Sequence, residues 1–222
     1  MELTLGLIVL REVAKRLPAS AQNVRDHIDF LLMTGGTLET DAFQMSFSGD
    51  PDELGQWRGY AANGMGCSVV TDTIAVKNVA DVAGWVIYDP KKQRAFAYKV
   101  LNRLRNETDN DKIQQALAAA ASYVKHEGFQ QELEFRILKF PDPVMVEFRE
   151  SGDRLVPFVD FLKGKTPLPI AKIIIGPGWQ LPKQTSDLTI NHVVQGIYRL
   201  LTARGIHLFT MIESSRIPYD PN

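Results

Sequence analysis

The first forty residues carry apolar side chains at helical spacing. Residues 5–17 and 20–33 are predicted to form two helices that Pro18 separates. Ser20 stands where a side-chain N-cap of the second helix is expected. One apolar stripe runs along that helix, formed by Val24, Ile28, Leu31 and Leu32. The pattern therefore predicts a helical N-terminal segment over residues 1–41.

The period then changes from helical spacing to strict alternation. In residues 42–48 the aromatic and Met side chains face one way, and Gln44, Ser46 and Ser48 face the other. Residues 131–140 alternate in the same manner, with Glu132, Glu134 and Arg136 on the polar face. Further strands are predicted at 67–71, 84–88, 144–149, 155–161, 173–175 and 206–212, and further helices at 91–105, 111–125 and 187–204.

Strands dominate the middle of the chain and helices flank them, without regular strand–helix–strand alternation. That order favours an α+β fold with a mixed, mostly antiparallel sheet flanked by helices. A chain of 222 residues is long enough for one sizeable core. We predict a single domain over residues 1–222, with 1–41 as a helical N-terminal extension and 42–222 as the α+β core.

Charge and cysteine content exclude several classes of protein. The formal net charge is −1 and no long run of like charges occurs, so the sequence does not indicate nucleic-acid binding. Cys67, which we expect in the core, is the only cysteine, and this fits a reducing compartment, the cytoplasm. No apolar stretch is long enough for a membrane span, the N-terminus is a poor signal peptide, and the four histidines lack metal-ligand spacing.

Two polar strand faces could form one site. If the strand of Ser46 and Ser48 neighbours the strand of Glu132 and Glu134, two hydroxyls and two carboxylates converge on one surface. Such a surface could stabilise developing positive charge and orient a substrate. The alternative is that both faces are merely solvated, as on any half-exposed strand.

A second candidate is the segment Gln56-Trp57-Arg58-Gly59-Tyr60. Arg58 could bind phosphate or carboxylate while Trp57 or Tyr60 stacks on a planar group. Alternatively, Trp57 anchors the core and Arg58 pairs with a carboxylate such as Glu132 or Glu134. A buried network of glutamate and arginine would also explain these acidic residues and Arg136 without catalysis.

Several short runs, taken in order, resemble the bacterial family called domain of unknown function 2971 over about residues 43–219. They are Ser46-Phe47-Ser48, Gln56 to Tyr60, Gly64-Met65-Gly66, Val86-Ile87-Tyr88, Phe129, Glu132 to Arg136, Phe148-Arg149, Leu155 to Phe158, Ile173 to Pro177, and Ser215 to Tyr219. The resemblance implies a bacterial intracellular protein of unassigned function, with some relatives suggesting phage defence. Residues 1–41 depart from the family, whose members begin with a strand.

The serine and glutamate pairs are also similar to the Ser-x-Ser and Glu-x-Glu motifs of mono-ADP-ribosyltransferases. This similarity implies NAD as substrate, Glu134 as the key carboxylate, Glu132 assisting it, and Ser46 and Ser48 bracing the site. No metal is implied.

The other ligand-binding residues of this enzyme hypothesis are Trp57, Arg58, Tyr60 and Arg136, with Arg58 on the phosphates. The arginines before Ser46 all lie on predicted helices, which departs from those enzymes. The competing hypothesis is a non-enzymatic module of a defence system that binds a nucleotide ligand, or a protein partner through residues 1–41.

Overall fold

The computed structural model describes residues 2–34, 42–162, 169–180, 186–206 and 211–218. The chain forms two compact units that alternate along the sequence. Unit 1 contains Met1–Phe47 and Val79–Lys163, and unit 2 contains Ser48–Asn78 and Gly164–Asn222. A compact unit need not fold independently, so the prediction of a single domain stays a prediction.

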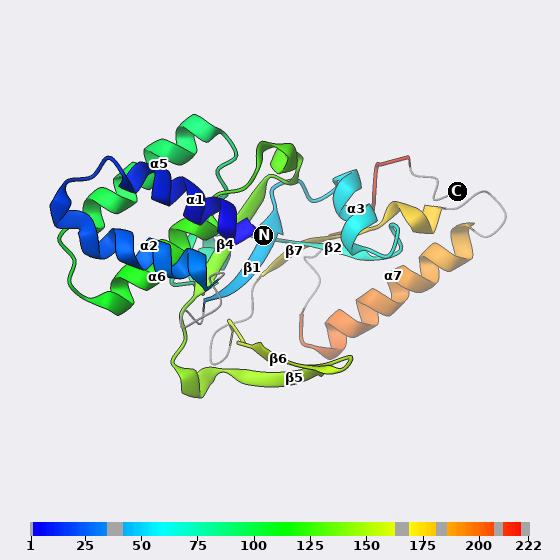
Figure 1. The fold of residues 1–222 in the computed structure, drawn as a ribbon. Helices are drawn as coiled ribbons and strands as arrows, with labels where there is room; N and C mark the ends of the chain where they lie inside the picture. The colour runs from blue at the N-terminus through cyan, green and yellow to red at the C-terminus, as the bar shows by residue number, and fades with distance from the viewer. Residues whose placement is uncertain (1, 35–41, 163–168, 181–185, 207–210, 219–222) are drawn as a thin grey trace. The chain divides into compact units, whose positions relative to one another are not determined.

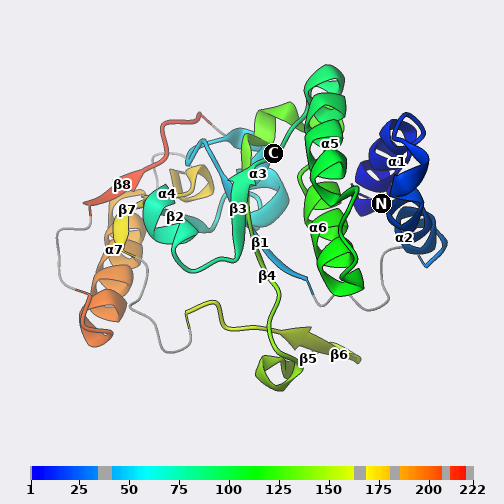
Figure 2. The same cartoon turned by 90° about the vertical axis from the view of Figure 1, so that its left-hand side faces the viewer.

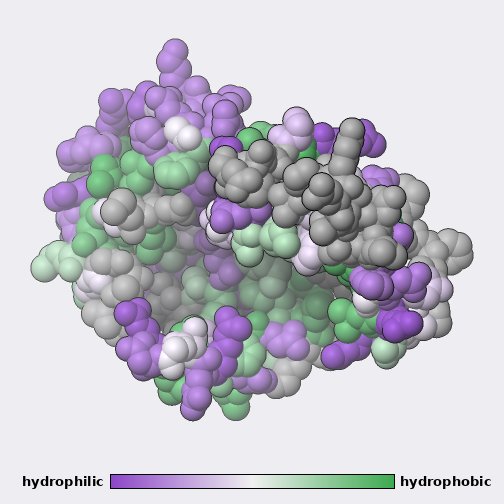
Figure 3. Space-filling model, turned by 90° about the vertical axis from the view of Figure 1, so that its right-hand side faces the viewer, coloured by the Kyte–Doolittle hydropathy of each residue, from purple (hydrophilic) through white to green (hydrophobic). Residues whose placement is uncertain are grey.

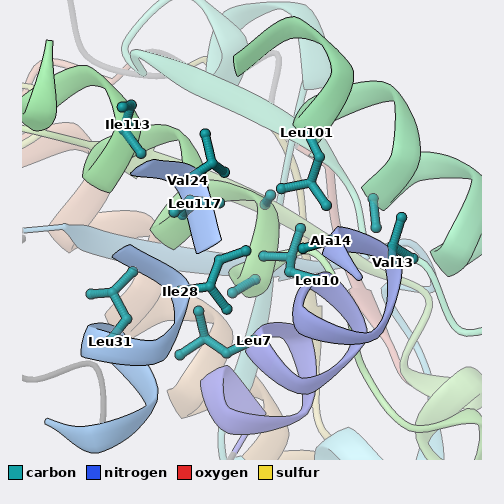
Figure 4. Packing of buried hydrophobic residues seen from close by; sticks show 13 residues of the cluster. Leu7, Leu10, Val13, Ala14, Val24, Ile28, Leu31, Leu101, Ile113 and Leu117 are labelled. Carbon is teal, nitrogen blue, oxygen red and sulfur yellow. The ribbon is translucent and has the colours of Figure 1, made fainter. Parts of the chain in front are cut away.

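Unit 1 contains a helical layer and a core between four long helices. Its helices are α1 (Glu2–Ala14), η1 (Ala19–Ala21), α2 (Gln22–Met33), α5 (Pro90–Leu104), α6 (Asn110–Ser122), η2 (Glu127–Glu132) and η3 (Pro143–Met145). Leu10 of α1, Ile28 of α2 and Leu117 of α6 point toward one another and are fully buried (Figure 4). Each such side chain contributes about 1.5–3 kcal/mol to stability. The apolar stripe of α2 is thus buried as the sequence predicts.

Helix α1 lies very close to α6, and a glycine makes this possible. A Cβ atom on Gly6 would stand 2.2 Å from the carbonyl oxygen of Ala121. Only glycine fits so near to another backbone. The N-terminal helices therefore form part of the core of unit 1, packed against α5 and α6.

The sheet of unit 1 lies on the other side of α5 and α6. Its strands are β1 (Phe43–Ser48), β4 (Glu134–Lys139) and β3 (Val82–Trp85), in the order β1-β4-β3. Figures 1 and 2 show α5 and α6 standing between this sheet and the α1–α2 pair. Strands β5 (Glu147–Ser151) and β6 (Arg154–Phe158) form a separate antiparallel hairpin. Strand β4 is the central strand, which explains why nearly all its residues are buried.

Unit 2 is built around β7 (Ile170–Ile175). This strand pairs antiparallel with β2 (Cys67–Thr71) and parallel with β8 (Met211–Ser214). Its helices are α3 (Leu54–Tyr60), α4 (Thr73–Lys77), η4 (Pro177–Gln180) and α7 (Ser186–Ala203). Both units combine helices with small, mostly antiparallel sheets. The fold is α+β, as the sequence predicts, with the strands distributed over separate sheets.

Two glycine-containing turns of unit 2 bind each other. The backbone N–H of Gly176 donates to Gly66 at 2.9 Å, and that of Gly178 donates to Gly64 at 3.0 Å. A Cβ atom on Gly176 would lie 2.1 Å from the Gly64 oxygen. These glycines allow a close backbone approach within the fold.

Several local predictions are wrong. Helix α2 begins at Gln22 after a 3-10 turn, so Ser20 lies inside that turn and makes no cap. The strand predicted at 84–88 ends at Trp85, because Ile87 turns to bridge with Val124 beyond α6. Cys67 is exposed instead of lying in the core. Within the predicted last strand, residues 207–210 lie outside the described residues.

Hydrophilic and hydrophobic residues are intermixed on the face of the molecule shown in Figure 3. Some large apolar side chains are exposed in the described part of the chain, among them Met33 and Val144. Single exposed apolar residues are normal at a protein surface. Among the described residues, no helix combines the length and the apolar character that crossing a membrane requires.

Candidate functional site

The strands that carry Ser46 and Glu134 are hydrogen-bonded neighbours, β1 and β4. The hydroxyl of Ser46 lies near enough to the carboxylate of Glu134 to lower the pKa of that carboxyl. The geometric condition for a shared polar surface is therefore met for this pair. Ser48 makes a local turn instead: its hydroxyl donates to the carbonyl of Asp50 at 2.8 Å and accepts from the Asp50 N–H at 3.2 Å.

Glu134 lies in a buried cluster of charged groups. Arg136, two residues along the same face of β4, donates from Nε to Oε1 at 2.6 Å and from Nη2 to Oε2 at 2.8 Å. Lys125, just beyond α6, donates from Nζ to Oε2 at 3.1 Å. Only 6% of Glu134, 2% of Arg136 and 6% of Lys125 is exposed. A fork of this kind is the strongest common pairing for a carboxylate.

Glu132 joins this cluster from a 3-10 helix and not from the predicted strand. It ends the 3-10 helix η2, and Leu133 follows in the left-handed region at φ 42° before β4 begins. Glu132 is therefore not on the strand face of Glu134. Its Oε2 accepts a hydrogen bond from Nζ of Lys125 at 2.6 Å, so one ammonium group connects the two carboxylates. A quarter of the Glu132 side chain is exposed, which makes it the open end of the cluster.

The pKa of the Glu134 carboxyl is lowered by its partners. Burial acts to raise this pKa, but hydrogen bonds from Arg136, Ser46 and Lys125, and the charge of Arg136, outweigh that effect. The group is ionised at neutral pH. Because its oxygens already accept three hydrogen bonds from the cations of Arg136 and Lys125, it has little capacity left to accept a proton or to stabilise a further cation.

Neighbouring residues hold this cluster in place through hydrogen bonds between side chains and backbone groups. The phenol of Tyr123 donates to the carbonyl of Arg136 at 3.1 Å, and burial raises the pKa of Tyr123 to about 12. The hydroxyl of Tyr88 accepts from the Glu134 N–H at 3.1 Å. Nη1 of Arg136 donates to the carbonyl of Ser122, at the end of α6. Sequence reasoning missed Lys125, Tyr88 and Tyr123, because no local pattern links them to β4.

An apolar cavity of about 410 Å³ lies beside the same sheet, between β3, α5 and α6. Phe96 and Val100 of α5, Ala116 of α6 and Trp85 of β3 contribute to its wall. Arg103 is the only charged side chain among the described residues that line it. The residues predicted as a catalytic site do not belong to this lining. Sequence reasoning gave no signal for the cavity, because it is a space between three elements.

The third predicted group, on α3, lies in unit 2. Trp57 is 3% exposed, and its indole N–H donates to Oδ1 of Asp52 at 2.8 Å. The same carboxylate accepts from Oγ of Ser215 at 2.6 Å and from the Arg216 N–H at 2.8 Å. Trp57 is therefore a core anchor, the alternative that the sequence left open. Arg58 and Tyr60 are exposed on the same short helix.

The described residues contain no group of three or more His, Cys, Asp or Glu side chains arranged to hold a metal ion. Their buried side-chain nitrogen and oxygen atoms all have hydrogen-bond partners. The charged cluster on β4 is thus fully satisfied within the chain, as buried polar groups in stable folds are.

Comparison with known proteins adds one match. No curated protein and no solved structure matches the chain. A family model described as "Protein of unknown function (DUF2971)" matches residues 56–137, from α3 to β4. The matched segment contains the charged cluster, β3, α5 and α6. Less than half of the chain is covered, so this segment is similar to a family whose own function is unknown.

Proposed function

We propose that the chain is a non-enzymatic binding module whose ligand occupies the cavity between β3, α5 and α6. The observation that carries this proposal is the cavity itself, with a volume of about 410 Å³. Ligand sites usually have volumes of roughly 300–1,000 Å³ and apolar walls with few polar groups. A wall with apolar residues from three elements and the single charge of Arg103 fits that description.

Trp85, one of three aromatic residues in the described lining of the cavity, has surface that a ligand could cover. Trp85 is 54% exposed, although its ring packs edge-on against Phe135 with centroids 5.1 Å apart. Burying more of such a ring stabilises a complex by about 25 cal/mol for each Å² of apolar surface. Trp85 would also report binding directly, because indole fluorescence changes when water is removed.

The charged cluster supports this proposal indirectly. A catalytic carboxylate must respond to charge that develops on the substrate. The Glu134 carboxylate is held by a two-bond contact with Arg136 and a third bond from Lys125. A structural counter-ion is the role that these contacts fit best.

The proposal is tested with anilinonaphthalene sulfonate, an apolar aromatic anion whose fluorescence rises in dry sites. Ala116→Phe places a ring in the cavity wall, whereas Ala95→Phe adds the same ring to an exposed position of α5 outside the lining. We expect saturable binding by the natural chain and by Ala95→Phe, and its loss in Ala116→Phe. Equal binding by all three proteins would contradict the proposal.

A second candidate function is NAD cleavage or ADP-ribosyl transfer with Glu134 as the key carboxylate. The observation that favours it is that Ser46 and Glu134 lie on neighbouring strands, with the Ser46 hydroxyl lowering the pKa of the Glu134 carboxyl. On this proposal Glu132 assists and Arg136 orients Glu134. Glu134→Gln should then abolish NAD turnover with an almost unchanged melting temperature. Absence of turnover by the natural chain would remove this candidate.

Ser48 and Trp57, which the sequence also assigns to that site, have contacts within unit 2. Ser48 bonds to Asp50, and Trp57 is buried against Asp52. A nucleotide ligand, a protein partner of residues 1–41 and a role in phage defence stay predictions. A thermal-shift screen that includes NAD would address the first, because a ligand that prefers the folded state raises its melting temperature.

A further inference from the structure

The edge of β3 that borders the cavity has no strand partner among the described residues. Strand β3 pairs with β4 in the antiparallel register Gly84↔Arg136 and Trp85↔Phe135. The Val86 N–H donates to the Glu134 carbonyl at 2.9 Å, which shows that even-numbered residues face β4. In an antiparallel ladder the alternate residues point away. The backbone N–H and C=O groups of Ala83 and Trp85 therefore face the opposite edge.

The position of the cavity fits this edge. A cavity against a sheet face would be lined by every second residue of the strand, because alternate side chains point to opposite faces. All four consecutive residues of β3, Val82 to Trp85, line the cavity. The cavity thus runs along the edge of the strand, where the outward backbone groups of Ala83 and Trp85 lie.

The same edge is already used for pairing farther along the chain. The Ile87 N–H donates to the Tyr123 carbonyl at 2.8 Å, and the Lys125 N–H donates to the Ile87 carbonyl at 3.3 Å. This short parallel bridge ends before Trp85. The outward-facing N–H and C=O groups of Ala83 and Trp85 therefore lie next to Ile87, which already pairs with residues 123–125 in the manner of a parallel strand.

We propose that an extended peptide with a carboxylate group binds as an added strand on β3. This inference rests on the proposed function and specifies its ligand. Ladder bonds to Ala83 and Trp85 would hold the peptide backbone, and one apolar side chain would enter the cavity. Arg103, which makes no ion pair with a described residue, would bind the carboxylate. Arg103 lies in the last turn of α5, where a positive charge also stabilises the helix through its dipole. A substitution of Arg103 could therefore change stability as well as binding, and it needs a control.

The test begins with a phage-displayed library of random peptides of about six residues, the usual length of a strand. The library is selected on the natural chain after depletion on Ala116→Phe. A selected peptide is then synthesised in two N-methylated versions, one methylated at odd and one at even positions. We expect one version to bind at least about tenfold more weakly, because each lost ladder bond weakens binding. The other version should bind nearly as the parent does, because only alternate N–H groups face β3.

Two variants of α5 test whether the charge of Arg103 binds the carboxylate of the peptide. Arg103→Gln should raise the Kd of the peptide by about two- to fivefold, as for a partly exposed ion pair. Arg94→Gln, on the same helix outside the lining, should leave it unchanged. Equal effects of the two variants would overturn the role of Arg103.

The outcomes separate this inference from the function on which it rests. If both methylated versions bind like the parent peptide, strand addition is wrong. The binding module then stands as long as Ala116→Phe still eliminates binding of anilinonaphthalene sulfonate. If neither that probe nor any selected peptide binds the natural chain, both proposals fail together.

Discussion

Arg136 holds both carboxylate oxygens of Glu134, at 2.6 and 2.8 Å, from a position two residues along the same strand. The pair is almost completely buried in the central strand of unit 1. Lys125 adds a second cation, which Glu132 balances at the open end of the cluster. The sequence left two interpretations of Glu134 open, a catalytic carboxylate and a member of a buried glutamate–arginine network, and the structure buries Glu134 against Arg136.

Glu134→Gln should therefore destabilise the protein strongly. It removes the charge that compensates Arg136 and leaves buried cations with one remaining carboxylate. Breaking a buried pair in this way costs about 3–5 kcal/mol. Urea unfolding followed by circular dichroism measures the loss. Glu150→Gln, on the exposed strand β5, is the matched control and should change stability by less than about 0.5 kcal/mol. Equal midpoints for the two variants would contradict the structural role.

Removing both partners of the fork should cost less than the single changes imply. Glu134→Leu alone leaves Arg136 without its counter-ion, whereas adding Arg136→Met removes that cation too. In the double variant Lys125 would keep its ion pair with Glu132, in which Nζ and Oε2 are 2.6 Å apart. We expect a favourable coupling of about 1–3 kcal/mol in a double-mutant cycle measured by urea unfolding. Strictly additive losses would mean that the two side chains do not stabilise each other.

The lowered pKa of Glu134 gives the stability of the fold a defined pH dependence. Because the folded-state pKa lies below the ordinary value of 4.5, the ionised group stabilises the fold above that value. This contribution is lost progressively as the pH falls from about 5 through the folded-state pKa. Unfolding free energies across this range should fall less steeply for Glu134→Gln than for the natural chain. Parallel curves would refute the assignment, since the other carboxyls are common to both proteins.

The hydrophobic pattern was a reliable guide to the elements but not to the cluster. Alternation predicted β1 and the main part of β4, and helical spacing predicted α5 and α6. Such features depend on neighbours in sequence. Lys125 meets Glu134 only because α6 lies over β4, and no local pattern records that contact.

The alternating pattern also misassigned residues at strand ends. Glu132 appeared to share a strand face with Glu134, but Leu133 adopts a positive φ and starts a new direction. Positive φ is uncommon for leucine, so sequence reasoning does not anticipate it. For the aromatic residues of α3 the sequence left a stacking surface and a core anchor open, and Trp57 is buried with its indole N–H on Asp52.

The contact between α1 and α6 predicts opposite effects for one substitution at two glycines. Gly6→Ala gains helix propensity, but its methyl group would collide with the backbone of Ala121. We expect a loss of about 1–3 kcal/mol, as for other overpacked sites. Gly196→Ala, in α7 with open space around it, should gain up to about 1 kcal/mol. Thermal unfolding of both variants measures the difference. A gain at Gly6 would show that α1 is not packed as described.

The central claim is that ligands bind in the cavity beside β3 and not at the charged cluster. An amide-detected NMR titration of the natural chain with anilinonaphthalene sulfonate, and then with NAD, tests it most directly. We predict that the sulfonate shifts the signals of Ala83, Gly84 and Trp85 most, and that NAD leaves the signals of Ser46 and Glu134 unchanged. Shifts centred on Ser46 and Glu134 with NAD, without changes at β3 with the sulfonate, would contradict the claim.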